Sequence, residues 1–198
     1  ADNLAELLHS EPLPPLKKEI ILIQSRGMAR WLSLKTASRL KIWANCKCPF
    51  PNTFIRNIYK LFMPDISDSS PYDKEFITWH LMDILPGLLN DPHFKKIQHY
   101  LQSDNGLKLY QFARETADLF DQYTLFRPSM VLDWEAHTNT PIAEHKWQSL
   151  LWAHLVKRLQ KNENISGHHR ARLLKYFEVK ILDPGFDKRQ LPTRISVF

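Results

Sequence analysis

The sequence has few of the residues on which disulfide-rich, membrane-spanning or secreted proteins depend. Its only two cysteines, Cys46 and Cys48, cannot form a disulfide framework. It has no run of about 18 apolar residues, so we expect no segment to span a bilayer. The first residues lack the basic region and apolar stretch that mark a secretory signal. We therefore expect a reduced, cytoplasmic protein.

Glycine is also scarce, with 5 among 198 residues against 13 prolines. A phosphate-binding loop needs several glycines, whose backbone N–H groups wrap a phosphate, and then a Lys followed by Ser or Thr. The expected turn at 24–31 has one glycine, Gly27, and no such pair. We therefore predict no nucleotide site after the first strand.

Carboxylates are absent from Ile20 to Pro64. The same stretch contains eight basic residues: Arg26, Arg30, Lys35, Arg39, Lys41, Lys47, Arg56 and Lys60. The net charge of +6 arises within the first 60 residues, and the remainder is balanced. A stretch whose charged side chains are all positive attracts a polyanion such as nucleic acid. The alternative is a solvated basic surface that binds nothing.

The pattern near the N-terminus predicts one strand–turn–helix unit of an α/β fold, after a short helix at 4–9. The apolar run 19–24 is typical of a buried parallel strand. Apolar residues at 28, 31 or 32, 34, 37 and 40 then share one face of a helix. Prolines keep 46–51 extended, and Asn52 or Thr53 is expected to cap a helix that ends near Phe62.

Beyond a linker at 64–73 the pattern becomes helical. Helices are expected at 74–89, 92–103, 107–126, 128–135, 143–161 and 168–180, with Pro86 kinking or ending the first of them. A turn at 183–185 and a strand at 194–198 follow. We predict an α/β part at 1–63, a large helical subdomain at 64–190 and a returning strand at 191–198. The unpartnered last strand leads us to expect a fragment of a larger protein.

Catalytic and metal-binding patterns are weak. Cys46 and Cys48 lack the second pair of ligands that a zinc site requires, and His168 and His169 have no partners at a useful spacing. Glu178 and Lys180 match half of a restriction-type nuclease site, but no upstream aspartate is present in 164–177. An enzyme with an unrecognised site remains an alternative.

The helix expected at 107–126 has two distinct faces. Its core face carries Leu109, Ala113, Ala117 or Thr116, Phe120 and Tyr123, and its polar face carries Gln111, Glu115, Asp118, Asp121 and Gln122. Carboxylates on a helix are usually only solvated. Beside a basic groove, they can accept hydrogen bonds from base edges, and Gln24 or Gln122 can both donate and accept.

Five segments of this chain resemble the N-terminal region of the RecC family, the gamma subunits of the exonuclease V (RecBCD) helicase–nuclease. They are IILIQSRGMARWL, ANCKCPFPNTFI, ARETADLFDQYTLFRP, HHRARLL and LPTRISVF. The resemblance implies a degenerate helicase-like (P-loop-type) α/β fold without ATPase motifs, and no enzyme activity or cofactor of its own. ATP and magnesium are expected only in the partner subunits.

The resemblance also implies a role in double-strand break repair by homologous recombination in the bacterial cytoplasm. In that family the subunit splits the duplex and scans the 3′ strand for the Chi hotspot. The implied partners are single-stranded and forked DNA and RecB-like and RecD-like subunits, with no membrane. The alternative is a structural scaffold that holds the helicase subunits without reading sequence.

The Chi-reading positions of the family fall on Gln24, Arg26, Arg30, Phe50, Arg56, Asp118, Leu119, Asp121, Gln122, Arg127 and Arg170. Three of them depart from the family pattern: Arg26 stands for a small hydroxyl residue, Arg30 for Gln and Arg56 for Trp. Phe50 is a milder change between apolar residues. The absence of this Trp removes a stacking surface worth about 1–3 kcal/mol per base. Strand binding is therefore expected, with a recognised sequence that differs or is lost.

Overall fold

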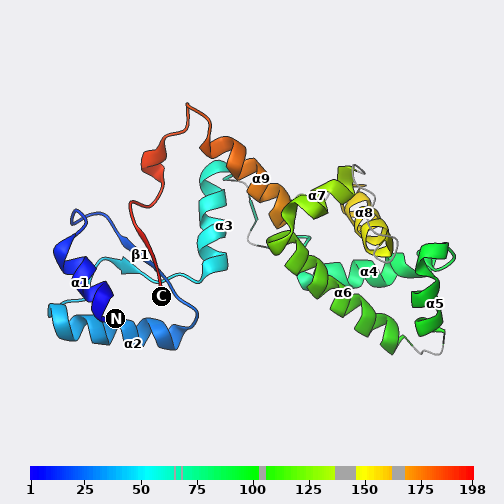
Figure 1. Ribbon diagram of the computed structural model, residues 1–198, viewed down its shortest axis with the longest axis horizontal. Coiled ribbons are helices and arrows are strands. Elements are labelled where there is room, and N and C mark those ends of the chain that lie inside the picture. Colours follow the sequence, from blue (N-terminus) through cyan, green and yellow to red (C-terminus); the bar gives the residue numbers. More distant parts are fainter. Residues whose placement is uncertain (65, 68, 103–105, 137–145, 162–167) are drawn as a thin grey trace. The chain divides into compact units, whose positions relative to one another are not determined.

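The computed structural model describes residues 1–64, 66–67, 69–102, 106–136, 146–161 and 168–198 (Figure 1). These residues form two compact units, one of 1–65 with 180–198 and one of 66–179. We call them the α/β unit and the helical unit. The described residues are mostly helical, with one small parallel sheet, as predicted. Residues 103 and 143–145, which the sequence pattern assigned to helices, lie outside the described residues.

The α/β unit contains α1 (Asp2–Ser10), β1 (Glu19–Leu22), α2 (Arg26–Leu40), β2 (Cys46–Lys47), α3 (Pro51–Phe62), the 3₁₀ turn η3 (Lys188–Gln190) and β3 (Ile195–Val197). The helical unit contains α4 (Lys74–Leu88), η1 (Pro92–Phe94), α5 (Lys95–Leu101), α6 (Leu107–Phe126), α7 (Pro128–Ala136) and α8 (Lys146–Lys161). Helix α9 (Arg170–Ile181) belongs mainly to the helical unit, and its last two residues belong to the α/β unit.

The sheet has the order β2-β1-β3, with both neighbours parallel to β1. Because side chains alternate along a strand, Ile21 and Ile23 point to the same face. Both are fully or almost fully buried, and they pack with Leu4 of α1 and Leu32 of α2. The two helices therefore cover the same face of the central strand (Figure 1).

The orientation of α2 corrects one prediction. Its buried positions are Leu32 and Thr36, whereas Trp31 and Leu34 are 50% and 63% exposed. Position 34 was expected on the core face. The helix also begins earlier than predicted, at Arg26, because the Ser25 hydroxyl accepts a hydrogen bond from the Met28 N–H at 3.1 Å. The core face of α2 runs along 28, 29, 32 and 36.

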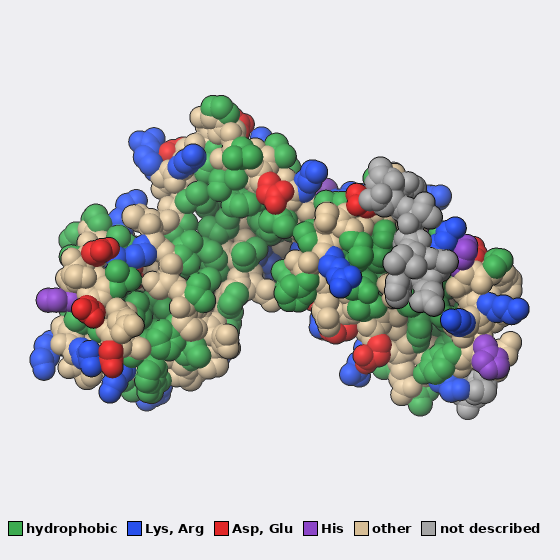
Figure 2. Space-filling view, in the orientation of Figure 1, with side chains coloured by type: hydrophobic (Ala, Val, Ile, Leu, Met, Phe, Trp, Pro, Cys, Tyr) green, Lys and Arg blue, Asp and Glu red, His purple; other side chains and the backbone are tan. Residues whose placement is uncertain are grey.

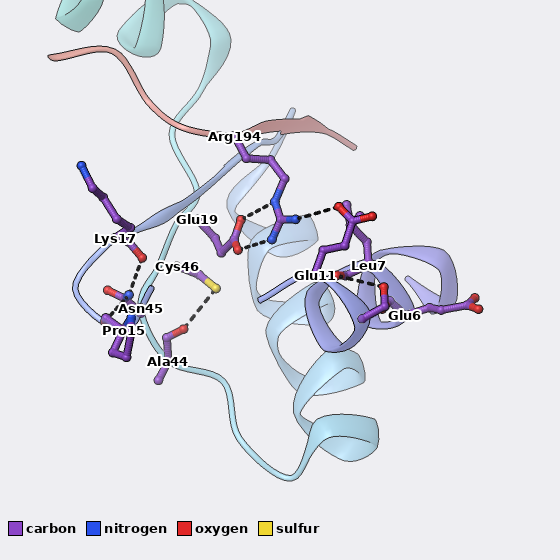
Figure 3. Close-up of polar contacts among 11 residues, drawn as sticks. Glu6, Leu7, Glu11, Pro15, Lys17, Glu19, Ala44, Asn45, Cys46 and Arg194 are labelled. Atoms are coloured by element: carbon purple, nitrogen blue, oxygen red, sulfur yellow. Dashed lines mark hydrogen bonds and ion pairs between the residues drawn. The ribbon is translucent and has the colours of Figure 1, made fainter. Parts of the chain in front are cut away.

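An ion pair joins the two strands that are farthest apart in the sequence. The Arg194 guanidinium, just before β3, holds the Glu19 carboxylate at the start of β1 with two hydrogen bonds, one of them 3.1 Å from Nε to Oε2 (Figure 3). Glu19 is buried, and the exposed Glu11 lies 3.9 Å from the same guanidinium. The contact sets β3 beside β1.

One expectation about a helix start is revised by proline geometry. Helix α3 begins at Pro51, so neither Asn52 nor Thr53 caps it; Phe50 occupies the cap position, and its side chain makes no capping hydrogen bond. Proline suits the first helical position because its missing N–H would have no partner there. Pro86 lies within α4, which continues for two residues beyond it.

The helical unit has the larger core. Buried apolar side chains from α4, α6, α7 and α8 meet there, and Trp152, Phe120 and Leu81 are fully buried. On α6 the predicted core face is confirmed at Ala113, Ala117 and Phe120, with Thr116 and Thr124 also buried. Leu109 and Tyr123 are only partly buried and pack against this core.

The described helices include none that is long and apolar enough to cross a membrane. The helicase-like character of the α/β unit stays a prediction, because three short parallel strands are common to many α/β folds.

Candidate nucleic-acid interface

Three sequence-predicted residues of the α/β unit lie near the carboxyl end of β1. Gln24 follows this strand directly, and Arg26 and Arg30 lie in the first turns of α2. All three side chains are exposed. In parallel sheets, ligands commonly bind at the carboxyl ends of the strands, next to helix N-termini whose free N–H groups favour anions. The position suits contact with a phosphate or a base edge.

Phe50 reaches the same end of the sheet from the neighbouring strand. The Ile23 N–H donates to the Pro49 carbonyl at 3.2 Å, so the residues that follow, Gln24 and Phe50, leave the sheet side by side. Phe50 is 39% exposed and offers an apolar ring. Arg56 is half-buried on α3, one and a half turns farther along the chain.

In the helical unit, Asp118 and Gln122 form a polar group on α6 with Lys74 of α4. Lys74 Nζ pairs with Asp118 Oδ1, and the Gln122 amide donates to Asp118 Oδ2 at 2.7 Å. The hydrogen bonds from Lys74 and then from Gln122 lower the pKa of Asp118, and the same contact raises the pKa of Lys74. Asp118 is therefore fully ionised at neutral pH.

One turn along α6, Asp121 faces Arg170 at the start of α9. The distance from Arg170 Nη1 to Asp121 Oδ1 is 3.5 Å, and the Arg170 side chain is 37% exposed. Leu119, which follows Asp118 on the same helix, is half-buried. Arg127, at the end of α6, places its guanidinium carbon 5.8 Å from the centre of the Tyr123 ring, within range of a cation–π contact.

The predicted site residues thus form two sets. The α/β unit contributes Gln24, Arg26, Arg30, Phe50 and Arg56, and the helical unit contributes Asp118, Leu119, Asp121, Gln122, Arg127 and Arg170. Within the second set, ion pairs and hydrogen bonds join Asp118 to Gln122 and Asp121 to Arg170. Arg127 contacts the Tyr123 ring instead. Lys and Arg side chains are visible on the surfaces of both units (Figure 2).

These groups have complementary hydrogen-bonding capacities. Carboxylates accept from exocyclic amino groups of bases, arginines donate to phosphates or to guanine, and glutamine amides do both. A phosphate contact gives affinity without sequence information, whereas a base-edge contact discriminates between sequences. The exposed cations of the α/β unit fit the first role, and the paired carboxylates of α6 fit the second.

Sequence reasoning missed the partners of these residues. Lys74 lies 44 residues before Asp118, and no local pattern links them. A second missed group joins α7, α8 and α9 through Glu135, Trp152, His169 and Arg172. The only signal for it is the pair His168 and His169, which lacks the partners that a metal site requires. Among the described residues no three His, Cys, Asp or Glu side chains are placed to hold a metal ion.

The cysteines and the nuclease-like triplet occupy places that suggest no chemistry. Cys46 and Cys48 are free thiols, half-buried against the core of the α/β unit. Burial, then the nearby Cys48 and Glu19, raise the pKa of Cys46 to about 11, so this thiol is a poor nucleophile. Glu178 is exposed on helix α9, and Lys180 is on the same helix rather than on a strand.

Comparisons with known proteins agree with the segments noted in the sequence. The family model for the N-terminal domain of RecC matches residues 1–198. The RecBCD enzyme subunit RecC of Haemophilus influenzae is 33% identical over 94% of this chain and 19% of its own length. The RecC subunit of Escherichia coli is 34% identical over 92% of this chain and 16% of its own. A Mycolicibacterium smegmatis RecC is 28% identical over the whole chain.

The chain spans less than a fifth of the length of these relatives. The match nevertheless covers both units, including every residue of the two sets described above. This chain therefore belongs to the RecC N-terminal domain family.

Proposed function

We propose that this chain is part of a non-catalytic DNA-recognition subunit of a RecBCD-type helicase–nuclease. It binds the 3′ single strand and scans it for a Chi-like hotspot during the repair of double-strand breaks. ATP hydrolysis and nuclease chemistry, with their magnesium, belong to RecB-like and RecD-like partners in the bacterial cytoplasm. The names of the relatives, RecBCD enzyme subunits, support this assignment.

The observation that carries the proposal is the exposed, carboxylate-free end of the α/β unit. Gln24, Arg26 and Arg30 are all exposed at the carboxyl end of β1, within a stretch of 45 residues that contains no acidic side chain. Nearby acidic groups would weaken the attraction of a phosphate backbone, and none is present in the local sequence. This end therefore captures the strand electrostatically, and Phe50 adds an apolar surface for a base.

The base-reading part of the proposal rests on Asp118, Asp121 and Gln122. Phosphates repel carboxylates, so these aspartates add nothing to affinity and act only in discrimination. Each is held by a cation or an amide, which fixes the direction of its oxygen atoms. Arg127 and Arg170 complete the set as donors. Because Arg26, Arg30 and Arg56 differ from the family pattern, the preferred sequence differs from the usual Chi octamer.

Fluorescence anisotropy with labelled single-stranded oligonucleotides at three salt concentrations tests the proposal. We compare the wild-type chain with a variant carrying Asp118→Ala and Asp121→Ala. A control carries Asp83→Ala and Glu178→Ala, two exposed acidic residues outside the set, and its net charge changes by the same amount. We expect affinity that falls steeply with salt, and a loss of discrimination in the first variant alone. No binding at low salt would overturn the proposal.

A second candidate function, a scaffold that never reads sequence, is favoured by exposed apolar side chains of the α/β unit. Leu34, Ile42 and Val197 are 63%, 67% and 81% exposed, and hydrophobic side chains are visible on the face in Figure 2. Clusters of such residues are typical of protein interfaces. A scaffold would tolerate Asp118→Ala and Asp121→Ala with the hotspot response of the assembled complex intact.

A further inference from the structure

A buried ionic cluster joins α7, α8 and the first turn of α9. At its centre is the Glu135 carboxylate, whose side chain is 8% exposed. Its Oε1 accepts from Trp152 Nε1 at 3.0 Å, and its Oε2 accepts from Arg172 Nε at 2.7 Å. Burial raises the pKa of Glu135, but the contacts with His169, Trp152 and Arg172 outweigh burial and lower it overall. The carboxylate is therefore charged although it is buried.

His169 closes the cluster from the residue just before α9. Its side chain is fully buried, and Nε2 lies 2.6 Å from Glu135 Oε1. That contact is not aligned with the ring N–H, so neither ring nitrogen makes a well-directed hydrogen bond within the described chain. The ring meets Tyr72 and Trp152 edge-on, with centroids 5.2 and 5.3 Å away. These contacts hold the imidazole in one place and one orientation.

The residue after His169 is Arg170, which faces Asp121 and belongs to the proposed base-reading set. His169 and Arg172, on either side of Arg170, are both tied to Glu135. Buried ion pairs contribute little net stability compared with apolar residues of the same shape. They do fix the rotation of a helix, because moving it would separate buried charges. The cluster therefore sets the direction in which Arg170 leaves α9.

We infer that Glu135 and His169 are positioning residues for Arg170. They act through the first turn of α9, touch no DNA themselves, and keep the Arg170 guanidinium against Asp121 so that the two side chains present one fixed pattern of donors and acceptors. This inference rests on the proposed function, since it assigns Glu135 and His169 a part in base discrimination. It extends the site to buried residues that lie outside the Chi-reading positions of the family.

The first test measures discrimination by Glu135→Gln, Arg170→Gln and the double variant. Each variant is titrated with a panel of labelled single-stranded oligonucleotides that differ at one base. For each variant, the Kd of the weakest-bound oligonucleotide is divided by the Kd of the tightest-bound one, and this ratio is compared with that of the wild type. We expect Glu135→Gln to lower this ratio by about fivefold, as one base-edge contact commonly contributes, with the salt dependence unchanged. The double variant should be no worse than Arg170→Gln, because both changes act on the same contact.

The matched control is Asp83→Asn, which removes an ion pair with Arg158 between α4 and α8 of the same unit. It should leave discrimination unchanged. Independent losses in the double variant, or full discrimination by a folded Glu135→Gln chain, would overturn the positioning role alone. A wild-type chain that binds without discrimination would overturn the proposed function, and the inference with it. If Glu135→Gln does not fold, Arg172→Gln replaces it in the same test. This change removes only the Arg172 contact and leaves Glu135 in contact with His169 and Trp152.

A second readout needs no DNA. The Arg170 Nε–Hε signal in an NMR spectrum of the chain reports how firmly the guanidinium is held. We expect a distinct signal in the wild type that broadens or shifts to the position of a free arginine in both Glu135→Gln and Asp121→Asn. The Asp83→Asn control should leave it in place. An Arg170 signal that responds to Asp121→Asn but not to Glu135→Gln would contradict the inference even if the proposed function holds.

Discussion

Replacing Arg194 with alanine should destabilise the α/β unit, because it removes the cation that is paired with the buried Glu19 carboxylate. The Arg194 side chain is 17% exposed and the Glu19 side chain 10%. The Glu19 carboxylate receives two hydrogen bonds from this guanidinium. Without Arg194, the buried carboxylate at the start of the central strand loses the cation that is paired with it. The register of β3 beside β1 loses its side-chain support at the same time.

The expected magnitude follows from the burial of the pair. Removing one partner of a buried ion pair costs about 3–5 kcal/mol, because the other charge stays desolvated. Both side chains keep some contact with water, so we expect a loss near the lower end, about 3 kcal/mol. With a urea slope of about 2 kcal/mol per molar, the unfolding midpoint falls by roughly 1.5 M.

Urea unfolding, monitored by hydrogen exchange with mass spectrometry, reports the stability of each unit separately. Peptides covering 19–23 and 194–198 should lose protection in Arg194→Ala, while peptides from α6 and α8 keep it. Glu11→Ala is the matched control, because Glu11 is exposed and 3.9 Å from Arg194, and it should change stability by less than about 0.5 kcal/mol. A loss below about 1 kcal/mol in Arg194→Ala, or equal losses in both variants, would refute the reasoning.

Three further predictions concern pH, salt and thiol reactivity. The pKa of Glu135 is lower in the folded chain than its usual value of 4.5, so the contribution of this carboxylate to stability is complete above pH 4.5. That contribution is lost as the pH falls through the lower pKa of the folded chain. Glu135→Gln should abolish this part of the pH dependence in urea titrations from pH 6 to 3. Arg26→Ser with Arg30→Gln should reduce the slope of log K against log salt, in anisotropy titrations, by about 0.7 for each phosphate that is no longer bound. The pKa of Cys46 is raised to about 11, so iodoacetamide should alkylate this thiol at pH 8 far more slowly in the folded chain than in the urea-unfolded chain. Equal alkylation rates, measured by mass spectrometry, would contradict this prediction.

Local periodicity was enough to predict the elements with strong patterns. Helix α6 spans Leu107–Phe126 in both the prediction and the structure, because its small and aromatic residues recur at helical spacing. The face of α2 was less accessible to this reasoning. Its apolar residues surround the helix, and the pattern placed residue 34 on the core face while leaving 31 or 32 open. Packing in the cluster with Ile21 buries Leu32 instead.

The contacts that organise the candidate site could not be read from the sequence. Lys74 and Asp118 meet because α4 and α6 pack together, and Glu135 meets Arg172 across 37 residues. Such pairs depend on the relative position of whole helices, which no local pattern encodes. The polar face of α6 was predicted correctly as a row of residues, but its cations come from other helices.

Under the proposed function, these cations explain how acidic residues can serve beside a bound polyanion. An isolated aspartate near a phosphate backbone weakens binding, and attractive base contacts would have to overcome that repulsion. In the helical unit Asp118 is paired with Lys74, and Asp121 with Arg170, so each pair is nearly neutral as seen from a distance of several ångströms. Such pairs cost little affinity, yet their oxygen atoms still face specific donors at short range. The proposed function therefore assigns affinity and discrimination to different residues, so that each can change without the other. On this proposal Arg26 and Arg30 can depart from the expected family pattern while the aspartates remain.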